Sequence, residues 1–219
     1  MAATLFNTRP VAHASAVANL TFFMDNGQSE RKLQLDTNHK AIGGLERLWS
    51  PLSFNKIVSE YLYVRAQAGP YCILAMEMTD KPERNRDISV SARLYYEGQL
   101  VCSPQNKCSS DKSGDTLHVE RIYDQDATLT DATGDHMQNI RGVFKDGTIA
   151  HRLKFSSAAA NKTWCFELRH KRPWWSIPTS PPGPDATGLS GFIDAVTGGE
   201  IESCEQYHGI GRSGQAQMH

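Results

Sequence analysis

Apolar and polar residues alternate with a period of two along most of the chain, which is the pattern of β-strands with one buried face. The alternating runs are rich in β-branched and aromatic residues, and turn residues such as Ala68-Gly69-Pro70 and Glu97-Gly98 separate them. The pattern predicts about ten strands, over residues 59–65, 71–79, 88–96, 99–102, 117–123, 127–129, 139–145, 151–155, 163–170, 191–196 and 200–207.

The segments between these runs also predict local structure. Asp146-Gly147 and Thr197-Gly198-Gly199 each lie between two apolar runs and favour the tight turn of a hairpin. Residues 41–49 are long enough for one or two helical turns at most, and two glycines oppose a helix there. Residues 103–116 are polar and predict a loop. Residues 173–188 hold five of the ten prolines and predict a proline-stiffened crossing rather than a strand.

Many antiparallel strands joined by tight connections favour a meander that closes on itself, because closure removes the exposed edges of an open sheet. We therefore expect an all-β fold, an antiparallel barrel of about eight to ten strands. The interior of such a barrel is either filled by side chains or holds one ligand. A single domain is expected over residues 1–219, with an N-terminal arm over 1–16 and a flexible C-terminal tail over 210–219.

Alternation divides each predicted strand into two faces. His151 shares a face with Phe155, and Trp164 shares one with His170, so closure of the barrel is expected to point several aromatic rings inward. The two faces of the run 71–79 are both largely apolar, which predicts a strand covered on both sides: they consist of Tyr71, Ile73, Ala75 and Glu77, and of Cys72, Leu74, Met76 and Met78.

Composition argues against several classes of partner. The formal net charge is −1 at pH 7, so no global field attracts nucleic acid or an anionic membrane. No apolar stretch approaches the roughly 20 residues of a membrane-spanning helix. The N-terminus lacks the basic and apolar regions of a secretory signal. These features predict a cytoplasmic protein with neither a nucleic-acid partner nor a membrane span.

Cysteines and histidines give no sign of a metal site. The five cysteines are odd in number and lack Cys-x-x-Cys spacing, which fits neither a disulfide framework nor a zinc site. Cys102 and Cys108 flank a polar loop and would pair only in an oxidising compartment, so free thiols in a reducing cytosol are the simpler interpretation. The sequence also lacks nucleotide-binding, metalloprotease and nucleophile-elbow motifs. We therefore expect no cofactor.

Aromatic residues are the remaining candidates for chemistry. Trp174 and Trp175 lie beside prolines and predict a rigid apolar wall, which either closes one end of the barrel or contacts a ligand. Tyr61 and Tyr63 either pack in the core or donate a hydrogen bond to a substrate carbonyl, because a phenol in an apolar pocket needs a partner.

The order of several motifs resembles one half of the lipocalin-like family that includes carotenoid 1,2-hydratases and the fungal Diels–Alderases of decalin-forming pathways. Family members open a core strand with a Trp-Trp-Tyr type motif, where this chain has Glu60-Tyr61-Leu62-Tyr63. They end a later strand in Gly-Tyr-His-Asp, where Gln206-Tyr207-His208-Gly209 keeps the Tyr-His pair and loses the aspartate. The resemblance runs from about residue 17 to 209 through the segments 58–63, 93–98, 142–147, 172–175 and 205–209.

The resemblance implies a lipocalin-like barrel with an apolar lumen and a cofactor-independent pericyclase of fungal secondary metabolism. Such an enzyme folds an unsaturated polyketide- or terpene-derived intermediate in an apolar pocket and polarises a conjugated carbonyl by hydrogen bonds. Family members have two barrel-like domains, so a lone domain would use its own lumen or pair as a homodimer. The donors to test are Tyr61, Tyr63, Arg93, His151 and Tyr207, and the candidate walls are Phe155, Trp164, Trp174 and Trp175.

Two other functions stay open. A lipocalin-like carrier would bind the same apolar small molecule without converting it. A hydratase or proton-transfer isomerase would need an acid, for which Glu60 and Glu77 are candidates because burial raises the pKa of a carboxyl group. Glu77 and Arg93 would instead form an internal ion pair if they lie at facing positions.

Overall fold

The computed structural model describes residues 6–15, 17–36, 42–49, 56–105, 114–123, 148–180 and 187–218. The chain divides into two compact units, Met1–Ser53 and Phe54–His219. Among the described residues both units consist of β-strands and loops with short 3-10 turns, and no α-helix occurs there. The expected hairpin at Asp146-Gly147 and the expected strands 127–129 and 139–145 lie outside the described residues, as does Cys108.

The smaller unit holds two antiparallel strand pairs, β1 with β4 and β2 with β3. Asn26 and Gly27 adopt positive φ angles of 55° and 90° in the turn that joins β2 to β3. Residues 42–49 form a strand instead of the helical turns considered from the sequence, because ladder bonds to β1 are available where two glycines disfavour a helix. The strands are β1 (Phe6–Ser15), β2 (Ala18–Met24), β3 (Ser29–Leu35) and β4 (Ile42–Trp49).

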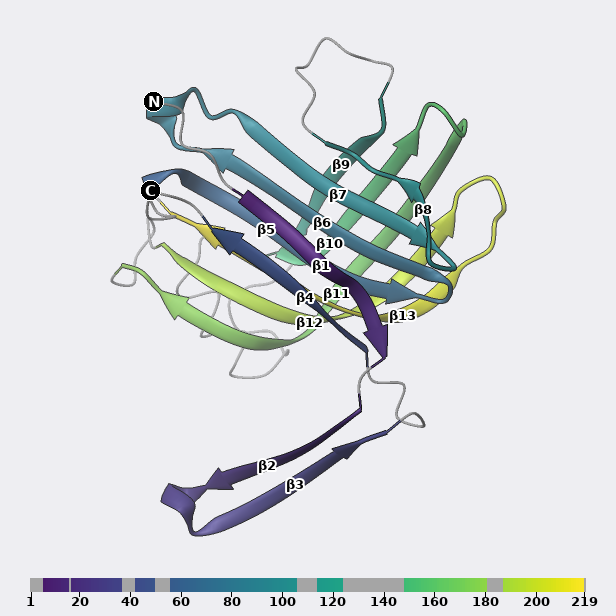
Figure 1. Ribbon diagram of the computed structural model, residues 1–219. Coiled ribbons are helices and arrows are strands. Elements are labelled where there is room, and N and C mark those ends of the chain that lie inside the picture. The colour runs from purple at the N-terminus through teal and green to yellow at the C-terminus, as the bar shows by residue number, and fades with distance from the viewer. Residues whose placement is uncertain are drawn as a thin grey trace. The chain divides into compact units, whose positions relative to one another are not determined.

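The larger unit is built on one nine-stranded antiparallel sheet, in the order β8-β7-β6-β5-β13-β12-β11-β10-β9 (Figure 1). The sheet consists of two meanders, and β5 meets β13 where they join. Its strands are β5 (Val58–Ala68), β6 (Tyr71–Asp80), β7 (Ile88–Tyr96), β8 (Gln99–Cys102), β9 (Thr116–Tyr123), β10 (Thr148–Ser157), β11 (Lys162–Pro178), β12 (Gly188–Glu200) and β13 (Tyr207–Gln217).

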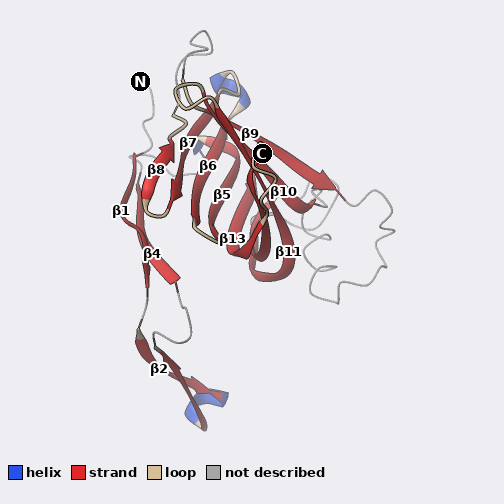
Figure 2. Ribbon diagram, turned by 90° about the vertical axis from the view of Figure 1, so that its right-hand side faces the viewer, coloured by secondary structure: helices blue, strands red, loops and turns tan. Residues whose placement is uncertain are grey.

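The nine-stranded sheet curls until its two ends approach each other (Figure 2). The thiol of Cys102 in β8 donates to the carbonyl oxygen of Ser156 in β10 at 3.6 Å. The edge strands β8 and β9 do not pair with each other within the described part of the chain. The sheet is therefore a curled half-barrel, which confirms the all-β, barrel-like expectation, although the ladder is not closed all the way round.

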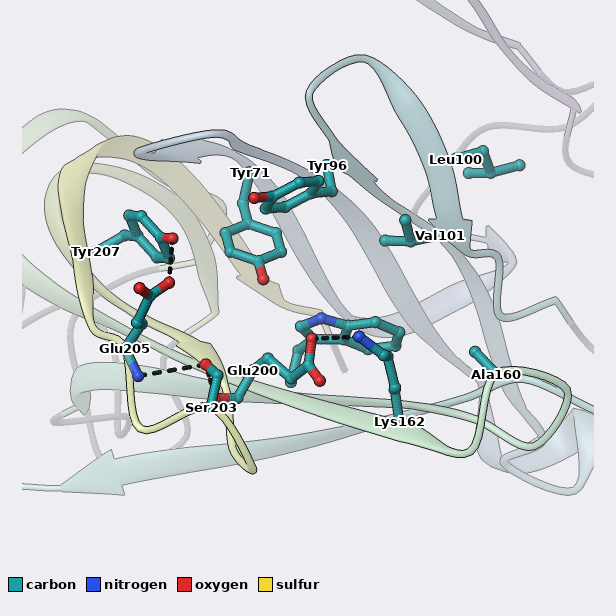
Figure 3. Close-up of a pocket in the computed structure, with 11 residues that line it drawn as sticks. Tyr71, Tyr96, Leu100, Val101, Ala160, Lys162, Glu200, Ser203, Glu205 and Tyr207 are labelled. Atoms are coloured by element: carbon teal, nitrogen blue, oxygen red, sulfur yellow. Dashed lines mark hydrogen bonds and ion pairs between the residues drawn. The ribbon is translucent and has the colours of Figure 1, made fainter.

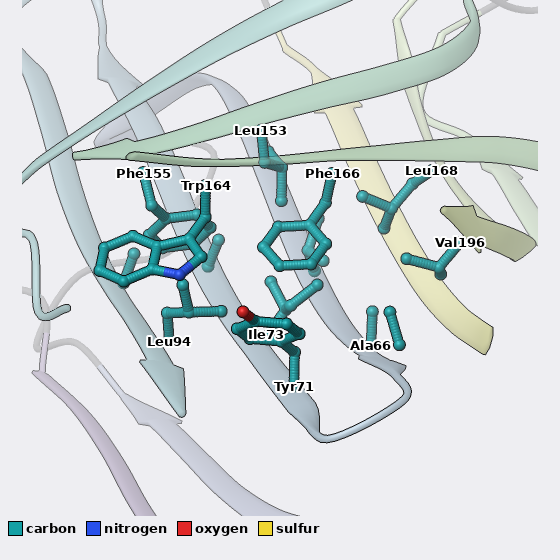
Figure 4. Packing of buried hydrophobic residues seen from close by; sticks show 14 of the residues in the cluster. Ala66, Tyr71, Ile73, Leu94, Leu153, Phe155, Trp164, Phe166, Leu168 and Val196 are labelled. Carbon is teal, nitrogen blue, oxygen red and sulfur yellow. The ribbon is translucent and has the colours of Figure 1, made fainter. Parts of the chain in front are cut away.

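Apolar side chains fill much of the interior of the curled sheet. Figure 4 shows side chains of β10 and β11 pointing across the interior toward those of β6 and β7. The ring of Tyr71 meets that of Phe166 edge to face, with 5.3 Å between centroids. In this region side chains occupy the space that a ligand would need. The largest members of the core are Trp164, Tyr71, Phe155, Phe166, Leu62, Ile73, Leu94, Leu153 and Leu168.

The strand β6 is buried on both of its faces. Leu74 and Met76, on the face of β6 that points away from this core, are also buried, which confirms the prediction of a strand covered on both sides.

Three segments depart from the sequence prediction. β11 continues through the proline-rich region to Pro178, and register shifts on both sides of Pro173 accommodate a residue that cannot donate to the ladder. The Thr197-Gly198-Gly199 segment lies inside β12. The turn follows it at 201–206, so the strand expected over residues 200–207 is wrong. Residues 210–217, expected as a flexible tail, belong to β13 near the middle of the sheet. Small residues there permit close contact between strands rather than mobility.

Candidate functional site

β5 presents its two faces to different surroundings. Leu62 points into the core, whereas Tyr61, Tyr63 and Arg65 lie on the opposite face. β13 contributes Arg212, the register partner of Arg65. The Tyr63 hydroxyl accepts hydrogen bonds from Arg65 Nε at 3.2 Å and from Arg212 Nη2 at 3.3 Å. Two guanidinium groups therefore hold one phenol oxygen.

Two tryptophans of β11 extend this face. The Arg212 guanidinium carbon lies 5.3 Å from the centroid of the Trp174 ring and 5.7 Å from that of Tyr63. Trp174 is 55% exposed, so much of its surface is available to a ligand. Trp175 packs over Gly191, where any Cβ would overlap the indole. We call the following residues the tyrosine–tryptophan cluster: Tyr61, Tyr63, Arg65, Trp174, Trp175 and Arg212.

The tyrosine–tryptophan cluster combines apolar surface with strong hydrogen-bond donors. Burial raises the pKa of Tyr61 to about 12, with a smaller contribution from Tyr63, so the Tyr61 phenol keeps its proton at neutral pH. The guanidinium groups on the Tyr63 oxygen withdraw charge from it and make its O–H a stronger donor. A carbonyl oxygen that gains negative charge in a transition state would be stabilised by such an arrangement.

A pocket of about 560 Å³ lies at one end of the curled sheet (Figure 3). Trp164 and Tyr207, expected from the sequence as a wall and a donor, line it. The Tyr207 hydroxyl donates to Glu205 Oε2 at 2.6 Å. This hydrogen bond raises the pKa of Tyr207 to about 12. The pocket is thus formed by residues different from those of the tyrosine–tryptophan cluster.

The interior also contains a buried polar group of side chains. His151 is fully buried, and its Nε2 lies 3.2 Å from the Oε1 of Gln215. His170 Nδ1 lies 2.7 Å from Asp194 Oδ1, with both side chains at most 1% exposed. The two imidazole rings meet edge to face at 4.9 Å, and His170 stacks on Phe192 at 4.0 Å. Strand alternation predicted that both histidines share faces with aromatic residues that point inward, and the register of the strands supplies their partners.

Because His151 is buried, we expect it to make the folded protein less stable at acidic pH. Desolvation lowers the pKa of His151 well below its usual value, and the nearby His170 and Arg121 lower it further. The folded protein therefore keeps His151 neutral, while the unfolded chain takes up a proton below about pH 6.5. From this residue we expect the free energy of unfolding to fall by up to about 1.4 kcal/mol for each pH unit below that value.

Urea unfolding at about pH 7, 6 and 5 measures this loss. The His151→Gln variant keeps a hydrogen-bonding side chain but does not titrate. Its free energy of unfolding should therefore fall less steeply with acidification than that of the unmodified protein. Equal slopes for the two proteins would contradict the role given to His151.

The two carboxylates predicted as acids face the interior from β5 and β6. Arg121 of β9 lies 3.9 Å from Glu60 and 4.0 Å from Glu77, and Arg86 lies 3.3 Å from Glu60. Burial raises the pKa of Glu77, and Arg121 opposes this shift. Arg93 lies on the other face of β7, so the pair considered with Glu77 does not form. Curling of the sheet brings β9 opposite β6 and supplies Arg121 instead.

The structure divides the predicted site residues among several places. Tyr61, Tyr63, Trp174 and Trp175 share the tyrosine–tryptophan cluster. The others lie at the end pocket, in the interior or on the outer face of β7: Trp164, Tyr207, Phe155, His151, Glu60, Glu77 and Arg93.

Sequence reasoning missed the two arginines of the cluster. Arg65 lies two residues after Tyr63, so strand alternation would have placed it on the same face. Arg212 lies in the segment expected as a tail, and its contact with Tyr63 joins residues 149 positions apart. Only the pairing of β13 with β5 identifies it.

Across the described residues, no group of three or more His, Cys, Asp or Glu side chains is arranged to hold a metal ion. No helix in that part of the chain is long and apolar enough to cross a membrane.

Comparison with known proteins gives consistent matches along the chain. The chain is 35% identical to the Diels-Alderase cghA of Chaetomium globosum over 221 residues, which cover 96% of this chain and 42% of that protein. It is 35% identical to the Diels-Alderase fsa2 of Fusarium heterosporum, covering 98% of this chain and 55% of that protein. The chain thus spans about half the length of these curated relatives.

Solved structures agree with the sequence matches. The crystal structure of CghA with Sch210972 matches with a TM-score of 0.82 and 35% identity, covering 98% of this chain and 55% of that chain. Kievitone hydratase from Nectria haematococca has a TM-score of 0.55 at 15% identity, a likeness of fold alone. The model of the Diels-Alderase-like family matches residues 1–219. The resemblance found in the sequence motifs is therefore confirmed, and the chain belongs to the Diels-Alderase-like family.

Proposed function

We propose that the protein is a cofactor-independent Diels–Alderase-type cyclase of fungal secondary metabolism, acting on an unsaturated polyketide- or terpene-derived intermediate. The observation that carries this proposal is the 35% identity to curated Diels-Alderases over 96–98% of the chain. Since those relatives are about twice as long, the activity of the whole protein remains our inference.

The tyrosine–tryptophan cluster is the part of the chain that we propose contacts the reacting molecule. The exposed ring of Trp174 offers an apolar surface on which a flexible polyene folds, and a folded substrate has already lost the entropy that the cyclic transition state requires. Tyr63 then donates a hydrogen bond to a conjugated carbonyl of the substrate. Arg65 and Arg212 donate to the Tyr63 oxygen and stabilise the negative charge that this oxygen gains as Tyr63 donates. Tyr61 is the second donor on the same face.

Incubation with a linear triene-carbonyl precursor tests the proposal. We expect cyclised product to form faster than in buffer alone, with a product ratio different from the uncatalysed one. Activity should survive exhaustive chelation and dialysis. Recovery of unchanged precursor would support a lipocalin-like carrier instead. A dependence on added metal or nicotinamide would contradict the mechanism.

A hydratase or proton-transfer isomerase is the second candidate, because burial raises the pKa of Glu77 and so favours its acid form. This function would incorporate solvent deuterium into the product and would be lost in Glu77→Gln. Deuterium-free product, with activity retained in that variant, would support the cyclase.

We further propose that the protein works in the cytoplasm on an apolar small molecule, without nucleic acid, either as a lone chain or as a homodimer. The formal net charge of −1 supports the absence of nucleic-acid binding. Light scattering on the purified chain gives the oligomeric state, and a monomer at all concentrations would contradict the dimer.

A further inference from the structure

The end pocket is an aromatic site formed by residues other than those of the tyrosine–tryptophan cluster, to which we assign the cyclase chemistry. Four rings from segments far apart in the sequence meet there: Tyr71, Tyr96, Trp164 and Tyr207. Figure 3 shows Tyr71 beside Tyr96, with Tyr207 on its other side. Trp164 lines the same pocket. At about 560 Å³ the pocket lies within the range of small-molecule sites.

Local backbone geometry fixes the aromatic rings in place. Gly69 has a φ of +53° in the turn between β5 and β6, and the ring of Tyr207 packs where a Cβ of residue 69 would lie. The turn therefore needs glycine for its conformation and for the contact. Tyr71 meets Tyr96 edge to face at 5.0 Å and Tyr207 at 5.5 Å. The pocket is thus built before any ligand arrives.

The charged groups of the pocket are mainly acidic. Glu205 accepts the hydrogen bond of Tyr207 at 2.6 Å, and Glu200 accepts one from Lys162 Nζ at 2.8 Å. Two carboxylates and one ammonium line the pocket, and Glu202 lies on the same β12–β13 turn. Among the lining residues that the structure describes, the one cation, Lys162, is engaged by Glu200, and the hydrogen-bond partner of the Glu205 carboxylate is the neutral hydroxyl of Tyr207.

We propose that this pocket binds an organic cation, an ammonium group attached to an aromatic or other apolar group. The electron-rich faces of aromatic rings attract ammonium ions, most strongly where water is partly excluded. Tyr96 and Tyr207 offer such surface to a ligand, whereas Tyr71 and Trp164 are only 3% and 2% exposed. Glu205 adds a full negative charge beside those faces, and the apolar part of the ligand fills the space against Val101 and Leu100. An anion of the same shape would be repelled, and a neutral molecule would lack both attractions.

Isothermal titration calorimetry of the full chain tests this site with three probes of nearly one shape: 2-phenylethylammonium, 2-phenylethanol and phenylacetate. We expect the ammonium ion to bind at least about tenfold more tightly than the alcohol, and phenylacetate to bind least. Quenching of tryptophan fluorescence should accompany binding, because Trp164 lines the pocket.

Two substitutions locate the binding to the pocket. Glu205→Gln is expected to weaken binding of the ammonium ion by about three- to tenfold and to leave that of the alcohol unchanged. Tyr96→Leu, which removes a partly exposed ring face, should weaken binding of the ammonium ion by about fivefold. The matched control is Glu83→Gln, an exposed carboxylate on the turn η4 (Pro82–Arg84) between β6 and β7, which should bind like the unmodified chain.

Equal affinities for the ammonium ion and the alcohol would overturn the proposal, as would an equal effect of Glu205→Gln and Glu83→Gln. The absence of binding at millimolar concentrations would overturn it as well. Melting temperatures of all variants show that a lost affinity does not come from unfolding. Since the titration uses no polyene and measures no turnover, its result is independent of the cyclase proposal.

Discussion

The Tyr63→Phe variant is expected to cyclise its substrate on the order of ten- to a thousandfold more slowly than the unmodified protein. The substitution removes one hydroxyl and keeps the ring, so the packing of Arg212 over that ring is preserved. The lost donor is the one that two guanidinium groups polarise. Product identity should not change, because the donor stabilises charge and does not shape the substrate.

Trp174→Ala should act differently from Tyr63→Phe. It removes a surface on which the substrate folds, so the ratio of products is expected to drift toward the uncatalysed distribution as the rate falls. Tyr123→Phe, on the edge strand β9 and about half exposed, is the matched control for loss of a hydroxyl and should keep the full rate.

Single-turnover rates and product ratios are compared only among variants with unchanged melting temperatures. A full rate in Tyr63→Phe would exclude this donor. The remaining donors to test by the same measurement are Tyr61→Phe, Arg93→Met, His151→Phe and Tyr207→Phe. Full rates in all five would exclude polar assistance by these residues, and catalysis would rest on shape alone.

Strand alternation predicted those parts of the fold in which one face is apolar and a clear turn ends the run. The expected strands 71–79, 88–96 and 99–102 coincide with β6, β7 and β8 to within one residue. Their turns contain Gly98 or the Gly69-Pro70 pair, whose backbone preferences are local. Local preferences are readable from the sequence because they need no partner strand.

The errors arise where the partner strand decides the conformation. Residues 210–217 contain small and polar residues that are typical of a tail, but β5 and β12 pair with them on both sides. Pro173 opposes a strand locally, and register shifts overcome this preference. The same holds for the candidate site. Alternation put Tyr61 and Tyr63 on one face, whereas Arg212 joins them only through the pairing of β13 with β5.

Ile73→Ala is expected to lower the free energy of unfolding by about 2–5 kcal/mol. Ile73 is fully buried in the core, between side chains of β5, β7 and the facing strands. Truncation removes apolar surface from the interior and leaves a cavity that the packed rings of Tyr71 and Phe166 fill only in part. Such a loss is a large share of the roughly 5–15 kcal/mol that stabilises a typical domain.

Ile210→Ala provides a control of identical chemistry. Ile210 lies in β13 of the same sheet but is 62% exposed, so its truncation should cost less than about 1 kcal/mol, mostly from lower strand propensity. Urea unfolding followed by tryptophan fluorescence measures both variants. A core filled by side chains requires the Ile73 variant to lose at least twice as much stability as the Ile210 variant. Similar losses would mean that the interior near Ile73 is loosely packed or open to solvent. The barrel interior would then be interpreted as a lumen that can hold a ligand, and not as a core filled by side chains.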